Sequence, residues 1–253
     1  MVGPAGIFNT GTNLLFELMK HNCDIREAAH STTHREPRRN GVRWQAPWGK
    51  HNPVSTHRLR NVAKMWGPGI NQTAFFPVVM IKDPYGWMGS LCRHRYGTFW
   101  DHDARHCPNV VDWRIPGGGA PVEVLVKFAM GIVRYASLVD MWNRWYLDYE
   151  AQGFPLLRTR FEDLLFHGEE VTRRVCACVG GVFADEFKYI EGSATENGMP
   201  IHVGANGLVK ALLQYGDPGK RTGGMTDADR RFAAGGLDEG LMRSFGYGHP
   251  PPP

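Results

Sequence analysis

Residues 3–14, GPAGIFNTGTNL, have the glycine spacing of a phosphate-binding loop. Gly6 and Gly11 stand at the two ends of a G-x-x-x-x-G pattern, and an amphipathic, helix-forming run, LLFELMKH, follows. Thr12 and Asn13 replace the lysine and the magnesium-holding hydroxyl residue of an ATP or GTP loop. The pattern therefore predicts an anion site made of backbone N–H groups, threonine hydroxyls and a helix N-terminus, with no metal. The alternative is a tight turn before a helix.

A second cationic segment, Lys82-Asp83-Pro84, ends the apolar run FFPVVMIKD. Ser90 lies eight residues after Lys82, on the helix predicted from YGWMGSLCRHRY. A cation and a hydroxyl at the end of a strand can hold a second phosphate, at the edge where open α/β sheets bind ligands. Each residue taken alone is also compatible with a surface ion pair or a serine on a helix face.

A third cationic segment, GDPGKRTGG, contains Lys220 and Arg221 between glycines. Flexible backbone with adjacent cations is suited to closing over a phosphate. Taken alone, the same segment is a solvated turn.

Together these segments resemble the sulfotransferase family, in an order and at approximate distances that hold from residue 3 to 247. Four matches carry the resemblance: Asn9 to Leu14 resembles the K-S-G-T-T-W loop, Lys82-Asp83-Pro84 with Ser90 resembles R-(D/N)-P-x5-S, Phe161-Glu162-Asp163 resembles Y-E-D, and Gly219-Lys220-Arg221 to Tyr247 resembles the C-terminal loop that closes over the donor.

The resemblance implies a co-substrate, 3′-phosphoadenosine 5′-phosphosulfate (PAPS), and no metal. It assigns the 5′ phosphosulfate to Asn9, Thr10, Gly11, Thr12, Asn13 and Leu14, and the 3′ phosphate to Lys82, Ser90, Lys220 and Arg221. A sulfuryl group carries less charge than a phosphoryl group, so hydrogen bonds and one cation can replace magnesium.

Lys50-His51-Asn52-Pro53 resembles the family's K-T-H-x-P stretch, which makes His51 the expected general base and Lys50 the group that stabilises the leaving phosphate. Histidine has a suitable unperturbed pKa for this at neutral pH. His57 is the substitute, and a plain surface role for His51 is the alternative. Asn9 stands where the family has Lys or Arg, so the missing cation must come from another residue, with Lys50 as the candidate, or activity is impaired.

Strand-like apolar runs at 75–83 and 154–161 alternate with helical patterns, which predicts an α/β fold with a central, mainly parallel sheet flanked by helices. The resemblance implies the P-loop-like sulfotransferase fold. One domain is expected over residues 1–247, with a proline-rich tail at 248–253. The apolar positions of 121–150 predict one long helix through Val124, Phe128, Ile132, Tyr135, Val139, Trp142 and Tyr146, and a short helix is expected near 56–66.

The irregular segments 31–73 and 98–120 are expected to line the pocket of a small-molecule or carbohydrate acceptor. Their aromatic residues can stack on a sugar or another ring, although burial in a core is their more common use: Trp44, Trp48, Trp66, Tyr96, Trp100 and Trp113. The sequence does not identify the acceptor.

A net charge of +4 with scattered cations favours a small polyanion over nucleic acid. No apolar stretch is long enough for a membrane span. The loop begins close to Met1, so we expect a trimmed N-terminus or a truncated gene model. The sequence leaves the compartment open: the cytoplasm is expected for the chain as written, and the Golgi lumen if an N-terminal anchor is missing.

Five cysteines form no C-x-x-C pair, so their spacing predicts neither a disulfide framework nor a zinc site. The residues Cys92, His94, His102, His106 and Cys107 match no zinc module, and no metal site is assigned.

Three functions stay open. The first is a PAPS-dependent sulfotransferase acting on a hydroxyl or amine. The second is a catalytically impaired, nucleotide-binding protein of the same fold. The third is a small-molecule kinase of P-loop-like fold.

Overall fold

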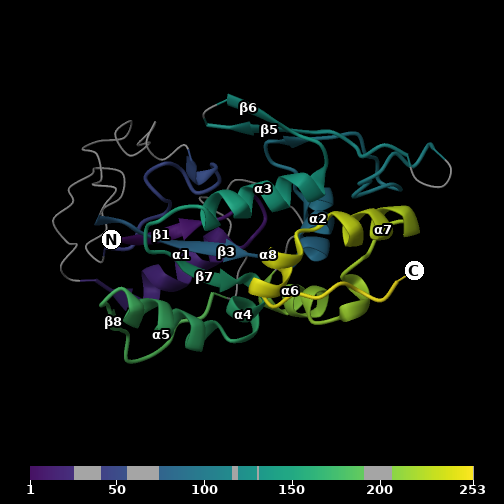
Figure 1. The fold of residues 1–253 in the computed structure, drawn as a ribbon. Coiled ribbons are helices and arrows are strands. Elements are labelled where there is room, and N and C mark those ends of the chain that lie inside the picture. Colours follow the sequence, from purple (N-terminus) through teal and green to yellow (C-terminus); the bar gives the residue numbers. More distant parts are fainter. Residues whose placement is uncertain (26–40, 56–73, 116–118, 130, 191–206, 253) are drawn as a thin grey trace. The chain divides into compact units, whose positions relative to one another are not determined.

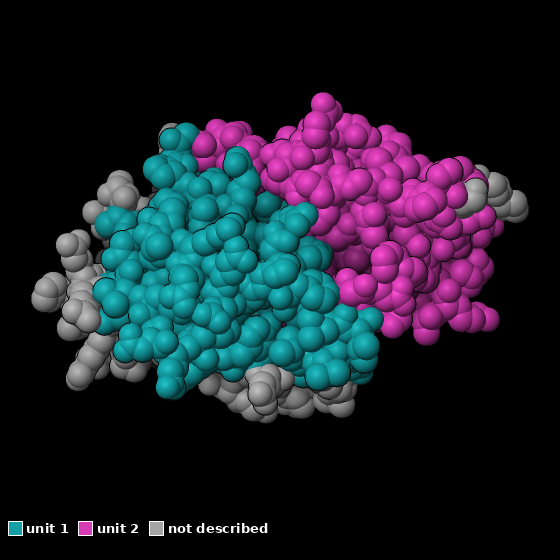
Figure 2. All heavy atoms as spheres, turned by 90° about the horizontal axis from the view of Figure 1, so that it is seen from below, with its two compact units in different colours: residues 1–81, 153–213 teal, residues 82–152, 214–253 magenta. Residues whose placement is uncertain are grey.

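The computed structural model describes residues 1–25, 41–55, 74–115, 119–129, 131–190 and 207–252. The chain divides into two compact units (Figure 2), which we call unit 1 (residues 1–81 and 153–213) and unit 2 (residues 82–152 and 214–253). The prediction of a single domain over 1–247 stays a prediction. The prediction of a short helix near 56–66 lies outside the described residues.

Unit 1 contains a parallel sheet of three strands in the order β1-β3-β7 (Figure 1). Its strands are β1 (Val2–Ala5), β3 (Phe76–Ile81) and β7 (Leu157–Arg160). The run Val78 to Ile81 is at most 2% exposed, as expected for a strand covered on both faces. The structure thus confirms the predicted parallel strands, and the chain has a mixed α/β fold.

The helices that flank this sheet begin soon after its strands end: α1 (Thr12–Asn22) after β1, and α4 (Phe161–Phe166) and α5 (Gly168–Cys178) after β7. Leu15, Leu18 and Met19 form the buried stripe of α1. A short antiparallel pair, β2 (Cys23–Asp24) and β8 (Val182–Phe183), completes the unit together with most of α6 (Gly207–Tyr215).

Unit 2 has an antiparallel sheet in the order β4-β5-β6, made of β4 (Thr98–Phe99), β5 (Val124–Phe128) and β6 (Gly131–Tyr135). Its helices are α2 (Pro84–Arg93), α3 (Leu138–Glu150), α7 (Asp227–Gly236), α8 (Glu239–Ser244) and the single turn η6 (Pro218–Lys220). Thr226 is the N-cap of α7 and forms a capping box with Asp229 at the start of that helix.

The prediction of one long helix over 121–150 is wrong in its first half, which is the β5–β6 hairpin. Val124, Val126 and Phe128 are at most 5% exposed and alternate with more exposed residues, which is the period of a strand. Ile132, expected on the buried helical face, is 70% exposed. The helix begins only after Ser137, whose side chain accepts a hydrogen bond from the Asp140 N–H.

Each unit contains a disulfide that cysteine spacing did not predict. Cys23 pairs with Cys176 in unit 1, 153 residues apart in sequence, and Cys92 pairs with Cys107 in unit 2, 15 residues apart. Among the described residues, no helix is long and apolar enough to cross a membrane.

Candidate functional site

The loop between β1 and α1 is a tight turn with unusual backbone angles. Asn9 and Gly11 both have positive φ angles, of 65° and 84°. An added Cβ at Gly11 would lie 2.5 Å from the Phe161 ring, so glycine is required there for space as well as for backbone conformation. Asparagine is one of the few other residue types that tolerate the left-handed region. Asn9 therefore suits its backbone conformation.

The loop is closed by hydrogen bonds inside unit 1. The buried Thr10 hydroxyl donates to the Ile7 carbonyl at 2.7 Å, so the proton that we expected to face a ligand is used within the loop. Gly11 is the N-cap of α1 and has no side chain to bond the first N–H groups. The first turn, which begins with Thr12 and Asn13 and continues through Leu14, has no acidic side chain. This helix start is suited to an anion.

Lys50 brings a cation to this loop from a distant part of the sequence. Its Nζ donates to Asn13 Oδ1 at 2.6 Å and lies 3.5 Å from the centre of the Trp44 ring. The residue is 6% exposed. The Lys50 carbonyl also accepts a hydrogen bond from the Gly6 N–H at 2.7 Å, so backbone and side chain both attach this segment to the loop.

His51 contacts the same loop through its ring. Its Nδ1 donates to the Gly6 carbonyl at 2.7 Å, and the Phe8 ring lies 4.5 Å away between centroids. Burial, and secondarily the Lys50 charge, lowers the His51 pKa to about 3. The imidazole is therefore neutral at physiological pH, and because Nδ1 carries the hydrogen, the lone pair is on Nε2. The other candidate base, His57, lies outside the described residues.

The second predicted segment forms a buried polar contact in unit 2. Lys82 is the first residue after β3, and its Nζ donates to Ser90 Oγ on α2 at 2.9 Å. The two residues are 2% and 4% exposed. Asp83 between them is the N-cap of α2 and accepts from the Gly86 N–H at 3.0 Å. The structure thus brings together the cation and the hydroxyl that the spacing suggested.

The third predicted segment separates its two cations. Arg221 pairs with Asp83 at 2.6 Å and lies 5.1 Å over the Tyr85 ring, so it is fixed beside the start of α2. Lys220 is half exposed and lies 3.7 Å from the Asp217 carboxylate on its own turn. Of the two, Arg221 is the one that the structure attaches to the Lys82-Asp83 segment.

Four residues, Lys82, Ser90, Arg93 and Tyr215, form a hydrogen-bonded group that we call the Lys82 cluster. Two of them, Arg93 and Tyr215, were not predicted from the sequence. Arg93 Nη2 donates to Ser90 Oγ at 3.2 Å and to the Tyr215 hydroxyl at 2.9 Å. Lys82 Nζ also donates to the Tyr215 hydroxyl, at 2.8 Å. Arg93 lies three residues after Ser90, so helical spacing could have found it. Tyr215 is 125 residues from Ser90, and no local signal connects them.

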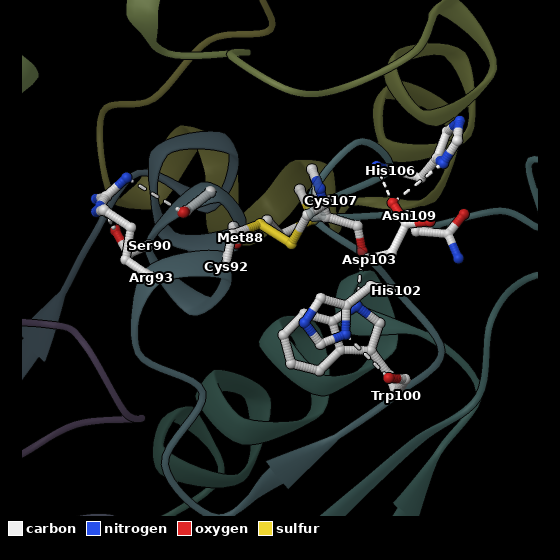
Figure 3. The surroundings of a disulfide bond; sticks show 12 residues. Met88, Ser90, Cys92, Arg93, Trp100, His102, Asp103, His106, Cys107 and Asn109 are labelled. Atoms are coloured by element: carbon white, nitrogen blue, oxygen red, sulfur yellow. Dashed lines mark hydrogen bonds and ion pairs between the residues drawn. A yellow bond between two sulfur atoms is a disulfide. The ribbon is translucent and has the colours of Figure 1, made fainter.

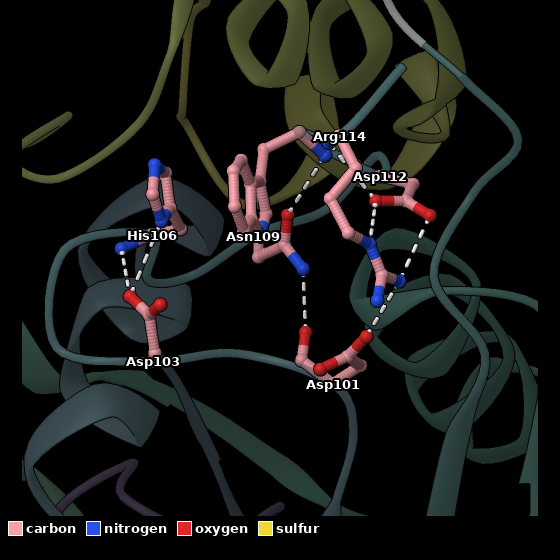
Figure 4. A network of polar contacts seen from close by, with 7 residues as sticks. Asp101, Asp103, His106, Asn109, Asp112 and Arg114 are labelled. Atoms are coloured by element: carbon pink, nitrogen blue, oxygen red, sulfur yellow. Dashed lines mark hydrogen bonds and ion pairs between the residues drawn. The ribbon is translucent and has the colours of Figure 1, made fainter.

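The segment after β4 presents polar and aromatic side chains on an irregular backbone (Figures 3 and 4). The Cys92–Cys107 disulfide attaches it to α2. The Trp100 ring stacks on His102 at 3.9 Å, and the His106 ring stacks on Trp113 at 3.8 Å.

Arg114 pairs with Asp101 and Asp112 at 2.7 Å each in the same segment. Side-chain and backbone hydrogen bonds from Arg114 lower the pKa of the Asp112 carboxyl. Within the described parts of the chain, no group of three His, Cys, Asp or Glu side chains is placed to hold a metal ion.

The six aromatic residues expected at an acceptor pocket divide by burial. Trp48 and Trp100 are at most 9% exposed and belong to the core, whereas Tyr96 and Trp113 are 38% and 42% exposed. Trp44 lies under the Lys50 ammonium group. Trp66 lies outside the described residues.

An open depression of about 530 Å³ lies in unit 1, between the start of α5 and the segment containing Phe187 and Tyr189. None of the predicted site residues lines it.

Comparisons of the chain with protein-family models, curated proteins and solved structures found no match.

Proposed function

We propose that this chain is a sulfotransferase of P-loop-like fold, which transfers a sulfuryl group from PAPS to a hydroxyl or amine of an acceptor. The loop of residues 9–14 would bind the 5′ phosphosulfate. Lys82, Ser90 and Arg221 would bind the 3′ phosphate, with Lys220 as the more exposed member of that set. No metal takes part in this proposal.

The observation that carries the proposal is the contact between Lys50 and the loop. A phosphosulfate loop without a cation would lack a group to neutralise the leaving phosphate. Lys50 Nζ, 2.6 Å from Asn13 Oδ1, supplies that charge at the first turn of α1. Asn9 can therefore lack a charge without leaving the loop neutral.

A second observation supports the proposed binding site for the 3′ phosphate of the donor. A nearly buried lysine bonded to a nearly buried serine is costly to desolvate unless it has strong partners. Lys82 and Ser90 lie at the end of a parallel strand and on the helix that follows, a position where α/β proteins bind phosphates.

In the proposed reaction, the acceptor oxygen attacks sulfur in line with the bridging oxygen of the phosphosulfate. The new O–S bond forms as the bond from sulfur to the bridging oxygen breaks, and its electron pair leaves with the 5′ phosphate. The acceptor proton goes to Nε2 of His51. Lys50 stabilises the negative charge on the leaving oxygen. The products are the sulfated acceptor and adenosine 3′,5′-bisphosphate.

The low pKa of His51 favours a second candidate function, a catalytically impaired protein that binds the nucleotide. A base with a pKa of about 3 takes a proton weakly. The negative charge of a bound donor would raise this pKa by offsetting Lys50. Without that rise, the chain would bind the nucleotide and not turn it over.

The exposed ring of Trp113, with the Arg114 ion pairs beside it, fits a carbohydrate or aromatic acceptor, since sugars stack on such rings and bond to such charges. We propose the segment 99–114 as the acceptor-binding part of unit 2.

The test is transfer of radiolabelled sulfate from PAPS to a panel of carbohydrates, phenols and amines, together with calorimetry of adenosine 3′,5′-bisphosphate. Transfer that is lost in Lys50→Met and kept in Lys20→Met supports the proposal. Lys20 is the matched control, because it is a cation on the last turn of α1, paired with Glu17. Binding without transfer would leave only the impaired candidate. Magnesium-dependent ATP binding with no affinity for PAPS would favour the kinase.

A further inference from the structure

The hydroxyl of Tyr215 lies where three donors of unit 2 converge. It is 2.8 Å from Lys82 Nζ, 2.9 Å from Arg93 Nη2 and 3.1 Å from Ser90 Oγ. Lys82 comes from the end of β3, and Ser90 and Arg93 from successive turns of α2. Two cations and a hydroxyl around one oxygen are the surroundings that phosphate oxygens have in proteins.

Ser90 has one proton and two lone pairs to share among its partners. Its Oγ accepts from Lys82 and Arg93, and it donates its one proton either to the Gly86 carbonyl at 2.7 Å or to the Tyr215 oxygen at 3.1 Å. The Tyr215 oxygen accepts from both cations at the same time. An anionic oxygen in this place would keep both cations, and Ser90 would direct its proton to that oxygen.

The surroundings also favour negative charge on the phenol. Burial raises the Tyr215 pKa, but the charges of Lys82 and Arg93 and the hydrogen bonds from Lys82 and Ser90 outweigh it and lower the pKa to about 8. The Lys82 ammonium also lies 4.0 Å from the centre of the phenol ring. The cluster therefore stabilises an anionic oxygen more than water does.

We propose that Lys82, Ser90 and Arg93 form a binding site for a phosphate monoester, and that the Tyr215 hydroxyl occupies this site in the structure and must leave when the phosphate binds. Tyr215 is thus an internal competitor, and Arg93 is a third ligand. With the proposed function, on which this part rests, the phosphate is the 3′ phosphate of PAPS.

Departure of Tyr215 requires only a local change. It is the last residue of α6, and the residues that follow it, Gly216 and Asp217, are exposed. Terminal turns of helices open at lower free energy than their centres. The phenol can therefore swing out while Lys82 and Ser90 stay in place.

The experiment compares the wild type with Tyr215→Phe, which keeps the ring over Lys82 and removes the competing oxygen. Tyr135→Phe is the matched control, because Tyr135 is a buried tyrosine of unit 2 on β6, where Arg144 lies over its ring. The probes are inorganic phosphate, adenosine 3′,5′-bisphosphate and adenosine 5′-monophosphate, measured by calorimetry at pH 7. Circular dichroism checks that each variant is folded.

We expect Tyr215→Phe to bind inorganic phosphate and the bisphosphate about tenfold more tightly than the wild type, since an oxygen bonded to two charged groups no longer competes. Adenosine 5′-monophosphate should gain about as much as inorganic phosphate, because its 5′ phosphate is also a monoester that can enter the site. Arg93→Met should weaken the two phosphates about tenfold. Weaker or unchanged phosphate binding in Tyr215→Phe would overturn the proposal, because the hydroxyl would then be a ligand or a bystander.

A pH series gives a second readout that does not depend on the variant's stability. As the pH rises through about 8, the Tyr215 phenolate forms and holds Lys82 and Arg93 more strongly. Phosphate affinity of the wild type should fall by up to about tenfold per pH unit above that value, and that of Tyr215→Phe should not. A parallel fall in both proteins would contradict the competition.

The proposal that Tyr215 competes with phosphate and the proposal of sulfotransferase activity can be rejected independently of each other. Tighter phosphate binding in Tyr215→Phe without any sulfate transfer would support the competitor and reject the sulfotransferase. Sulfate transfer with unchanged phosphate affinity in Tyr215→Phe would support the enzyme and reject the competitor.

Discussion

The two proposed anion sites, the loop of residues 6–14 in unit 1 and the Lys82 cluster in unit 2, differ in what they are built from. The loop depends on backbone: positive φ angles at Asn9 and Gly11, a helix start, and one cation that Lys50 brings to an amide oxygen. The cluster depends on side chains, with two cations and a hydroxyl directed at the phenol oxygen of Tyr215.

A neighbouring lysine lowers a pKa in both regions, with opposite results for charge. Burial, and secondarily the Lys50 charge, lowers the His51 pKa, which keeps the imidazole neutral. Lys82 and Arg93 lower the Tyr215 pKa despite burial, which brings the phenol closer to ionisation. A nearby positive charge thus opposes charge on the imidazole in the loop and favours charge on the phenol in the cluster. The loop should therefore be sensitive to changes of backbone, and the cluster to changes of charge.

The strongest test of the backbone argument is Gly11→Ala. The left-handed conformation costs a non-glycine residue about 1–2 kcal/mol, and the contact with the Phe161 ring adds about 1–3 kcal/mol of overpacking. We expect a loss of roughly 3 kcal/mol in the free energy of unfolding, measured in urea, and loss of donor binding by calorimetry. Gly153→Ala is the control, since a Cβ there would meet no atom of the described residues within 4 Å. Equal stability of the two variants would contradict the argument.

His51→Asn separates positioning from proton transfer. The Asn Nδ2 can replace His Nδ1 as the donor to the Gly6 carbonyl, so the loop should be kept while the Nε2 acceptor is lost. We expect kcat to fall about a thousandfold with donor affinity nearly unchanged, as for loss of a general base. An unchanged kcat would remove His51 as the base.

Lys50→Met tests whether the loop needs its borrowed cation. Methionine keeps much of the stem over Trp44 and removes the charge beside Asn13. We expect kcat/KM to fall about a hundredfold, the range seen when one donor to a developing oxyanion is lost. Lys20→Met should be within a few-fold of the wild type. If both variants behave alike, the loop works without a local cation.

The pH dependence of the free energy of unfolding should also distinguish the two regions. The folded His51 pKa lies below the unfolded value of 6.5, so its contribution is full above 6.5 and declines between 6.5 and 3, by up to about 1.4 kcal/mol per pH unit. The folded Tyr215 pKa lies below the ordinary tyrosine value of 10, so its contribution is full above 10 and is lost as the pH falls to 8. Urea midpoints should lose the acid slope in His51→Asn and the alkaline slope in Tyr215→Phe. Slopes equal to the wild type would contradict these assignments.

The sequence predicted what short-range patterns determine. The loop before a helix, the Lys82–Ser90 contact and the parallel strands all follow from patterns within a dozen residues. A role for Lys50 at the loop was expected only through the family resemblance, its contact with Asn13 was not predicted, and Tyr215 was missed, because nothing local connects residues so far apart.

The long helix was predicted wrongly for a different reason. Apolar residues at 124, 128, 132 and 135 fit a helical period, while Val124, Val126 and Phe128 also fit a strand period. β-branched residues are enriched in strands. Ile132 carried the helical interpretation, yet it lies on the exposed side of the hairpin. Pairing of β5 with β4, which a local sequence pattern does not reveal, favours the strand.

The two disulfides have a practical consequence for handling the protein. Thiols, a common addition to enzyme buffers, can exchange with Cys92–Cys107, the covalent link between the segment that carries Trp113 and the helix that carries Ser90 and Arg93. A purified sample that fails in such a buffer would say nothing about its competence. Expression with an oxidising folding machinery, and storage without reductant, are the conditions under which the activity measurements above can be interpreted.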